Sequence, residues 1–102
     1  PQDHPLALCD QRSVDRSDLA ICETLEPNLK EPMAHTVSVH NPDNRWFWFS
    51  DMTPDEAIVF LNYNDDEHGP PACPHTAFHD PSARNAVPRA SFELRFYVFY
   101  EG

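Results

Sequence analysis

The sequence ASFELRFYVFY, residues 90–100, gives the clearest indication of the fold. Ser91, Glu93 and Arg95 alternate with apolar side chains, and one face of the stretch is apolar throughout: Phe92, Leu94, Phe96, Val98 and Tyr100. A period of two residues is typical of a strand, because successive side chains point to opposite faces. The stretch therefore predicts a long strand with one buried face.

Shorter strands are expected before it. Residues 5–9 form an apolar run that ends at Asp10, and residues 35–40 alternate between polar and apolar. Residues 41–44 have turn chemistry and precede the aromatic run Arg45 to Phe49. These features predict a hairpin over residues 35–50. Residues 10–34 are interpreted mainly as a connection, with a helical turn near Ser17.

The next part of the chain contains a capping box. Thr53 is followed three residues later by Glu56, with Pro at the first helical position. Residues 57–61 are apolar and rich in β-branched side chains, and we favour a strand over a short helix there. Residues 64–74 are expected to be a solvated loop, residues 75–78 a strand and residues 80–88 a second loop.

Together these segments predict a mainly β domain of antiparallel strands with little helix. The chain has 102 residues, which suits one domain. Lys and Arg number 7 against 17 Asp and Glu, for a net charge of −10. Scattered basic residues in an acidic chain exclude a nucleic-acid partner and disfavour an anionic membrane surface. Cys9, Cys22 and Cys73 fit neither a disulfide framework nor a zinc motif, and three reduced thiols indicate a cytoplasmic protein.

Two groups of residues could carry chemistry. Arg89 lies in phase with the polar face of the stretch 90–100, so Arg89, Ser91 and Arg95 form either a solvent face or the polar lining of a barrel mouth. In a barrel, arginine could grip a carboxylate through paired N–H donors. His75 stands out among six His because it lies between an apolar strand and this polar face. His79 follows four residues later, but Pro74 argues against the helix that would pair the two on one metal.

The order of these features resembles one family, the fungal hydroxylase/desaturase group called AsaB-like or CmcJ-like, of the iron(II)/2-oxoglutarate oxygenase type. The resemblance covers nearly the whole chain. It is carried by five pieces: Pro5-Leu6-Ala7-Leu8-Cys9-Asp10; Asn41-Pro42 with Arg45-Trp46-Phe47; Asp51-Met52-Thr53-Pro54-Asp55-Glu56-Ala57; Pro74-His75-Thr76-Ala77-Phe78 with Asp80-Pro81; and Pro88-Arg89-Ala90-Ser91 with Glu93 and Arg95.

The resemblance implies a double-stranded β-helix of the jelly-roll, cupin-like type. Such enzymes bind iron(II) with two His and one carboxylate. His75 resembles the second of these His, and Arg89 with Ser91 resembles the Arg-x-Ser pair that anchors 2-oxoglutarate. Arg95 is the alternative anchor or a partner of Glu93. The implied reaction couples oxidative decarboxylation of 2-oxoglutarate to hydroxylation or desaturation of a small molecule of secondary metabolism.

The family's His-x-Asp motif is absent from this sequence, and the resemblance places it before Pro1. We therefore expect the C-terminal portion of one oxygenase-like domain, with an irregular lead-in over residues 1–34 and a β core over residues 35–102. Such a fragment needs the missing N-terminal segment and is inactive alone. One alternative is a non-catalytic β domain that binds a partner or small ligand through an exposed 46–49 strand. Another is a small zinc or other metal protein that uses Cys73, His75, His79 and a carboxylate.

Overall fold

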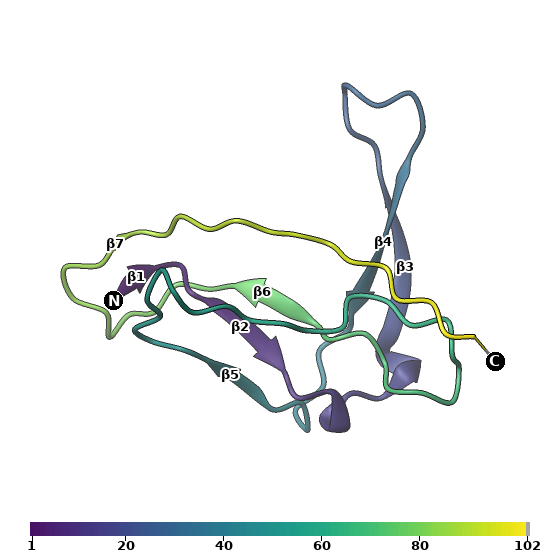
Figure 1. The fold of residues 1–102 in the computed structure, drawn as a ribbon, viewed down its shortest axis with the longest axis horizontal. Helices are drawn as coiled ribbons and strands as arrows, with labels where there is room; N and C mark the ends of the chain where they lie inside the picture. Colours follow the sequence, from purple (N-terminus) through teal and green to yellow (C-terminus); the bar gives the residue numbers. More distant parts are fainter. Residues whose placement is uncertain (102) are drawn as a thin grey trace.

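The computed structural model describes residues 1–101 and has seven short strands and two 3-10 turns (Figure 1). The strands are β1 (Gln2–Asp3), β2 (Leu6–Cys9), β3 (Leu19–Thr24), β4 (Met33–Ser38), β5 (Trp46–Trp48), β6 (His75–Ala77) and β7 (Val87–Pro88). The 3-10 turns are η1 (Gln11–Ser13) and η2 (Arg16–Asp18). The predicted fold class, mainly β with little helix, is confirmed. Residues 1–101 include no helix long and apolar enough to cross a lipid bilayer.

Strand β2 is the centre of the fold. It pairs antiparallel with β5 on one side and β6 on the other, so that Leu8 lies opposite both Phe47 and His75. Ala7, Leu8 and Cys9 are buried, and Cys73 is buried beside them. The Cys9 N–H donates to the carbonyl of Pro74 at 2.9 Å, which holds the chain next to Cys73 against β2. A strand with two neighbours loses the most water-accessible surface, which explains why its side chains are the core. The strands predicted at 5–9 and 75–78 are confirmed.

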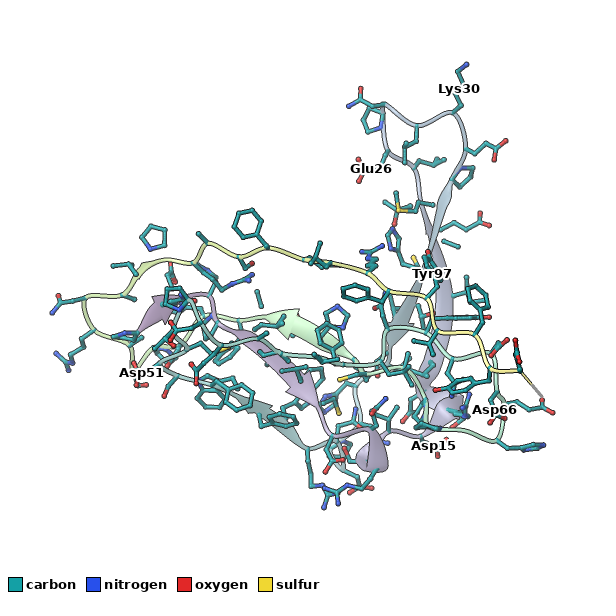
Figure 2. The ribbon with its side chains drawn as sticks, in the orientation of Figure 1. Asp15, Glu26, Lys30, Asp51, Asp66 and Tyr97 are labelled. Carbon is teal, nitrogen blue, oxygen red and sulfur yellow. The ribbon has the colours of Figure 1, made fainter. Side chains whose placement is uncertain are left out.

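The hairpin predicted over residues 35–50 is wrong. Strand β4 pairs with β3, in a register that places Val37 opposite Ala20, and the resulting hairpin projects away from the central sheet (Figure 1). Glu26 and Lys30 lie at its far tip (Figure 2). The pairing continues beyond the strands, because Val39 N–H donates to the carbonyl of Asp18 at 2.8 Å. Residues 19–24, which were expected to be part of a connection, form strand β3 of this hairpin. Strand β5, which was expected to pair with residues 35–40, pairs with β2.

The capping box forms without the helix or strand that was expected after it. Thr53 N–H donates to Oε2 of Glu56 at 2.7 Å, and Glu56 N–H donates to the carbonyl of Thr53 at 3.1 Å. These bonds close a single turn. Residues 57–61 then run as extended chain outside the ladders, so the strand predicted there is wrong. Cys73 N–H donates to the carbonyl of Leu61 at 2.7 Å, which ties the end of this segment to the buried sheet.

The long strand predicted over residues 90–100 is also wrong, because this stretch has no ladder partner among residues 1–101. It runs as plain extended chain from β7 toward the C-terminus (Figure 1). We call residues 90–100 the C-terminal segment. Its apolar face is bare: Phe92 is 103% exposed and Leu94 is 78% exposed. A strand needs a neighbour for its N–H and C=O groups, and the sequence pattern could not reveal that this neighbour is missing here.

Strands β1 and β7 form a parallel pair that closes the molecule at the N-terminus, with Gln2 opposite Val87 and Asp3 opposite Pro88. The terminal amine of Pro1 lies 3.3 Å from the carboxylate of Asp51, which Figure 2 places at the same end of the molecule. The division of the chain into a lead-in over 1–34 and a β core over 35–102 stays a prediction. The strands do not follow it, since β2, the most buried strand, lies before residue 34.

Candidate functional site

His75 is the first residue of β6 and lies opposite Leu8 of the central strand. Its Nδ1 lies 2.9 Å from the carbonyl oxygen of Cys73. A carbonyl can only accept, so Nδ1 is the donor of this bond, and in the neutral form of the ring the lone pair is on Nε2. The ring of Phe60 packs against the imidazole with centroids 4.6 Å apart. A fixed neutral imidazole with a free Nε2 is the form that binds a metal ion.

Arg89 and Ser91 lie together in the structure, and their role as a co-substrate anchor stays a prediction. A terminal nitrogen of Arg89 donates to Oγ of Ser91 at 2.9 Å, and Nε donates to the backbone carbonyl of His4 at 2.8 Å. The guanidinium is exposed and keeps donors free, because only two of its five N–H groups have partners here. It can therefore still receive a carboxylate.

Arg95 forms an ion pair with Glu93, and its role as an alternative anchor for the co-substrate stays a prediction. Its Nε lies 2.9 Å from Oε1 of Glu93, and both side chains are exposed. An exposed pair of this kind contributes little to stability, since water screens it. The three residues expected to bind the co-substrate thus separate into an Arg89–Ser91 pair and an Arg95–Glu93 pair.

A group of three ligand atoms occurs elsewhere. Asp3, His4 and His79 each place one metal-ligating atom within 4.8 Å of the others, and this is the one such grouping found among residues 1–101. His75 and Cys73 do not belong to it. Asp3 and His4 have no role in the sequence-based predictions, and His79 has one only in the alternative of a small metal protein. The β2–β6 register is what brings His4 and His79 together, and this register cannot be predicted from the sequence.

The residues of this chain do not fit a complete iron site of the two-His, one-carboxylate kind around His75. His75 belongs to no group of three or more ligating residues among residues 1–101. We therefore derive no reaction step through an iron ion from this chain. The metal protein suggested for Cys73, His75 and His79 lacks the same grouping.

The end of β2 carries the strongest local electrostatics. Hydrogen bonds from the Arg12 side chain and backbone, helped by the charge of Arg45, lower the pKa of Asp10 to about 2. The carboxylate receives Arg12 Nε at 3.0 Å and the guanidinium of Arg45 at 3.1 Å. Beneath this network lies a mainly apolar cavity of about 440 Å³, lined in part by Leu8, Phe47 and Cys73. His75 and Arg89 are not among its lining residues, so the cavity and the candidate ligands are separate.

The fold is a mainly β one, with short antiparallel strands around β2. A family model described as Oxidoreductase/YMDC permease-like domain matches residues 2–99, and the chain belongs to this family.

The chain is also similar to several curated proteins. The chain is 36% identical to the hydroxylase/desaturase AsaB of Aspergillus flavus, over 99% of this chain and 50% of that protein. It is 36% identical to the hydroxylase/desaturase EfuI of Hormonema carpetanum, over 95% of this chain and 36% of the relative. It is 29% identical to the Fe(II)/2-oxoglutarate-dependent dioxygenase NvfI of Aspergillus novofumigatus, over 95% of this chain and 35% of the relative.

The chain thus spans between about a third and a half of the length of these relatives. No solved structure matches it. The resemblance predicted from the sequence is confirmed at the level of the family.

Proposed function

We propose that this chain is the C-terminal part of a non-haem iron(II)/2-oxoglutarate oxygenase that hydroxylates or desaturates a small metabolite, and that it is inactive by itself. The observation that carries the proposal is the similarity to hydroxylase/desaturases and to an Fe(II)/2-oxoglutarate-dependent dioxygenase over nearly all of this chain. The three free thiols suit a reducing, cytoplasmic location.

The surface area supports an incomplete domain. The chain exposes 9053 Å², whereas a folded monomer of its mass exposes about 5,900 Å². Its radius of gyration is 15.8 Å, against about 13 Å for a compact domain of this length. Obligate interfaces bury about 2,000–5,000 Å² or more summed over both partners, so an excess of about 3,000 Å² on one chain is large enough for an obligate interface. An upstream segment of the same domain would cover it, and the bare C-terminal segment would then gain a strand partner.

Each candidate residue has a role in this proposal. His75 supplies one metal ligand through Nε2, with Nδ1 held by the carbonyl of Cys73. Arg89 binds the distal carboxylate of 2-oxoglutarate and Ser91 orients it; Arg95 is the alternative anchor. The upstream segment supplies the other imidazole and the carboxylate. Bound iron(II) would supply the redox chemistry, while this half of the domain holds the co-substrate and excludes water.

The experiment compares the 102-residue chain with the same chain joined to the upstream coding sequence of its gene. Succinate formation from 2-oxoglutarate is measured with iron(II) and oxygen. We expect turnover only in the joined protein, and none after His75→Ala. The matched control is His68→Ala, which removes an exposed loop imidazole beside Glu67. Turnover that survives His75→Ala, or an upstream sequence without a His-x-Asp motif, would contradict the proposal.

A second measurement separates the two arginines. Arg89→Ala in the joined protein should raise the 2-oxoglutarate KM about 10- to 100-fold, because a charge-assisted hydrogen bond contributes about 1.5–3 kcal/mol. Arg95→Ala should change this KM little. The reverse result would identify Arg95 as the anchor and leave Arg89 as a support for the His4 backbone.

A further inference from the structure

We propose that Asp3, His4 and His79 form a second metal site, separate from His75, that binds a divalent transition-metal ion such as Zn²⁺. It goes beyond the oxygenase function, because it uses none of the residues assigned to iron or 2-oxoglutarate. Asp3 and His4 are distant in the sequence from His79, and the tertiary structure brings them together.

The register of the central sheet creates the site. Strands β2 and β6 are antiparallel, with Leu8 opposite His75 and Leu6 opposite Ala77. The same register, continued two residues past Leu6, places His4 opposite His79. The chain keeps this register, since Phe78 N–H donates to the carbonyl of Pro5 at 3.3 Å. The two imidazole centroids lie 5.9 Å apart.

The backbone at His4 is held in place from both sides. Asp3 pairs with Pro88 in the β1–β7 ladder, and Arg89 Nε donates to the carbonyl of His4 at 2.8 Å. His4 itself has a φ of 50°, in the left-handed region that few residues other than Gly adopt. This conformation lies at the point where the chain passes from β1 to β2. The carboxylate of Asp3 lies 2.7 Å from Nδ1 of His4.

The distances suit one ion after small side-chain rotations. Zinc binds nitrogen and oxygen at about 2.0–2.2 Å, so two ligands of one ion lie about 3–4 Å apart. The three atoms here lie within 4.8 Å, and His4 and His79 are exposed enough to rotate. Two imidazoles and one carboxylate are a donor set that zinc, nickel and copper accept. Three protein ligands leave at least one position for water or an exchangeable ligand.

The surrounding charge favours a cation. Asp80 follows His79 directly, and its carboxylate is fixed next to the site by hydrogen bonds from the backbone N–H of Ser82 at 2.9 Å and from the Ser82 hydroxyl at 2.6 Å. The opposing charge is Arg89, whose guanidinium is turned to the carbonyl of His4 and the hydroxyl of Ser91. The chain as a whole has a net charge of −10.

His75 cannot share this ion. Four residues of extended chain separate His75 from His79, which corresponds to about 13 Å. One ion with ligand bonds of about 2 Å cannot span that distance. The two metal functions are therefore independent, and each can fail without the other.

The test is calorimetric titration of the 102-residue chain, free of any affinity tag, with zinc chloride. We expect one ion per chain, and at least tenfold weaker binding after His79→Ala or Asp3→Asn. His4→Asn is the matched variant for the third ligand, because Asn tolerates a left-handed φ and so preserves the turn. Tryptophan fluorescence and circular dichroism of each variant check that the fold is retained.

The controls are His68→Ala and His75→Ala, and both should bind zinc as the unchanged chain does. No binding at millimolar zinc would overturn the proposal. Wild-type affinity in folded His79→Ala would also overturn it, as would loss of binding in His75→Ala, which would assign the ion to His75. Turnover of the joined enzyme is not needed for any of these results.

Discussion

Strand β2 and the C-terminal segment are both apolar stretches of extended chain, yet Leu8 of β2 is 2% exposed whereas Phe92 is 103% exposed. The difference lies in their neighbours. Strand β2 has β5 and β6 on its two edges, and Cys73 packs beside it. The C-terminal segment has no ladder partner among residues 1–101 and no layer over its apolar face.

An apolar pattern and actual burial are therefore two different properties of a strand. A pattern of alternating side chains specifies which face of a strand is to be buried, but burial itself needs a second surface. Strand β2 finds that surface within this chain. The C-terminal segment does not, and its apolar side chains are the largest reason to expect a further part of the domain.

The largest expected effect is on the stability of the β2 sheet. Leu8→Ala removes a buried side chain and leaves a cavity, which costs about 2–5 kcal/mol of unfolding free energy. Urea unfolding followed by the fluorescence of Trp46 and Trp48 measures it. The matched variant is Leu94→Ala in the C-terminal segment, which should change stability by less than about 0.5 kcal/mol. Equal effects of the two substitutions would remove the contrast between the regions.

The C-terminal segment should become sensitive when the upstream part of the domain is present. Leu94→Asp should weaken association with a separately produced upstream segment by at least about 30-fold, because a charge on the buried face costs about 2 kcal/mol or more. Glu93→Gln changes the opposite face and serves as the control. Association measured by size-exclusion chromatography that ignores Leu94→Asp would show that this face does not receive the upstream segment.

Thiol reactivity extends the comparison to single atoms. Cys22 on the hairpin is exposed, whereas Cys9 and Cys73 are buried at the central sheet, and desolvation raises the pKa of Cys73. With an aromatic disulfide reagent at pH 8, Cys22 should react at least about tenfold faster than the other two thiols. Cys22→Ser should remove the fast phase. Three fast thiols in the folded chain would mean that the central sheet opens readily.

The smallest effect concerns Asp10 at the end of β2. Its pKa is about 2 in the folded chain and about 3.9 in an unfolded one. Because the folded value is the lower one, the carboxylate stabilises the fold above about pH 4 and loses this contribution as the pH falls toward 2. Urea midpoints from pH 5 to pH 2 should therefore fall less steeply in Asp10→Asn than in the unchanged chain.

Arg12 identifies the source of this effect. Arg12→Ala removes the side-chain hydrogen bonds that contribute most to the low pKa of Asp10 and keeps the backbone N–H bond, so it should flatten the pH dependence in part, less than Asp10→Asn does. If Arg12→Ala keeps the full dependence, the Arg12 backbone N–H and Arg45 hold the carboxylate instead.

Local chemistry was predictable from the sequence. The strands at residues 6–9 and 75–77, the turn at Asn41 and the capping-box bonds of Thr53 all depend on residues close together in the chain. Strand β3 was missed because Pro27 and the polar residues around it led us to interpret residues 10–34 mainly as connection. The order of motifs was enough to identify the family, whereas the roles of His75 and Arg89 stay predictions.

Strand partners could not be predicted in the same way. The segment 46–48 has the same aromatic pattern whether it pairs with residues 33–38 or with β2, and the choice depends on which edge offers the buried apolar surface. The segment 90–100 has a strand pattern, but it has no ladder partner among residues 1–101.

By itself, the sequence determined the fold class, the family and the residues that resemble the family's site. These depend only on side-chain chemistry and on the order of residues along the chain. The tertiary structure decided which strands pair, which imidazole nitrogen of His75 is free, and that His4 meets His79 beside Asp3. These results depend on register, since a ladder brings together residues that are distant in the sequence and whose spacing has no local signal.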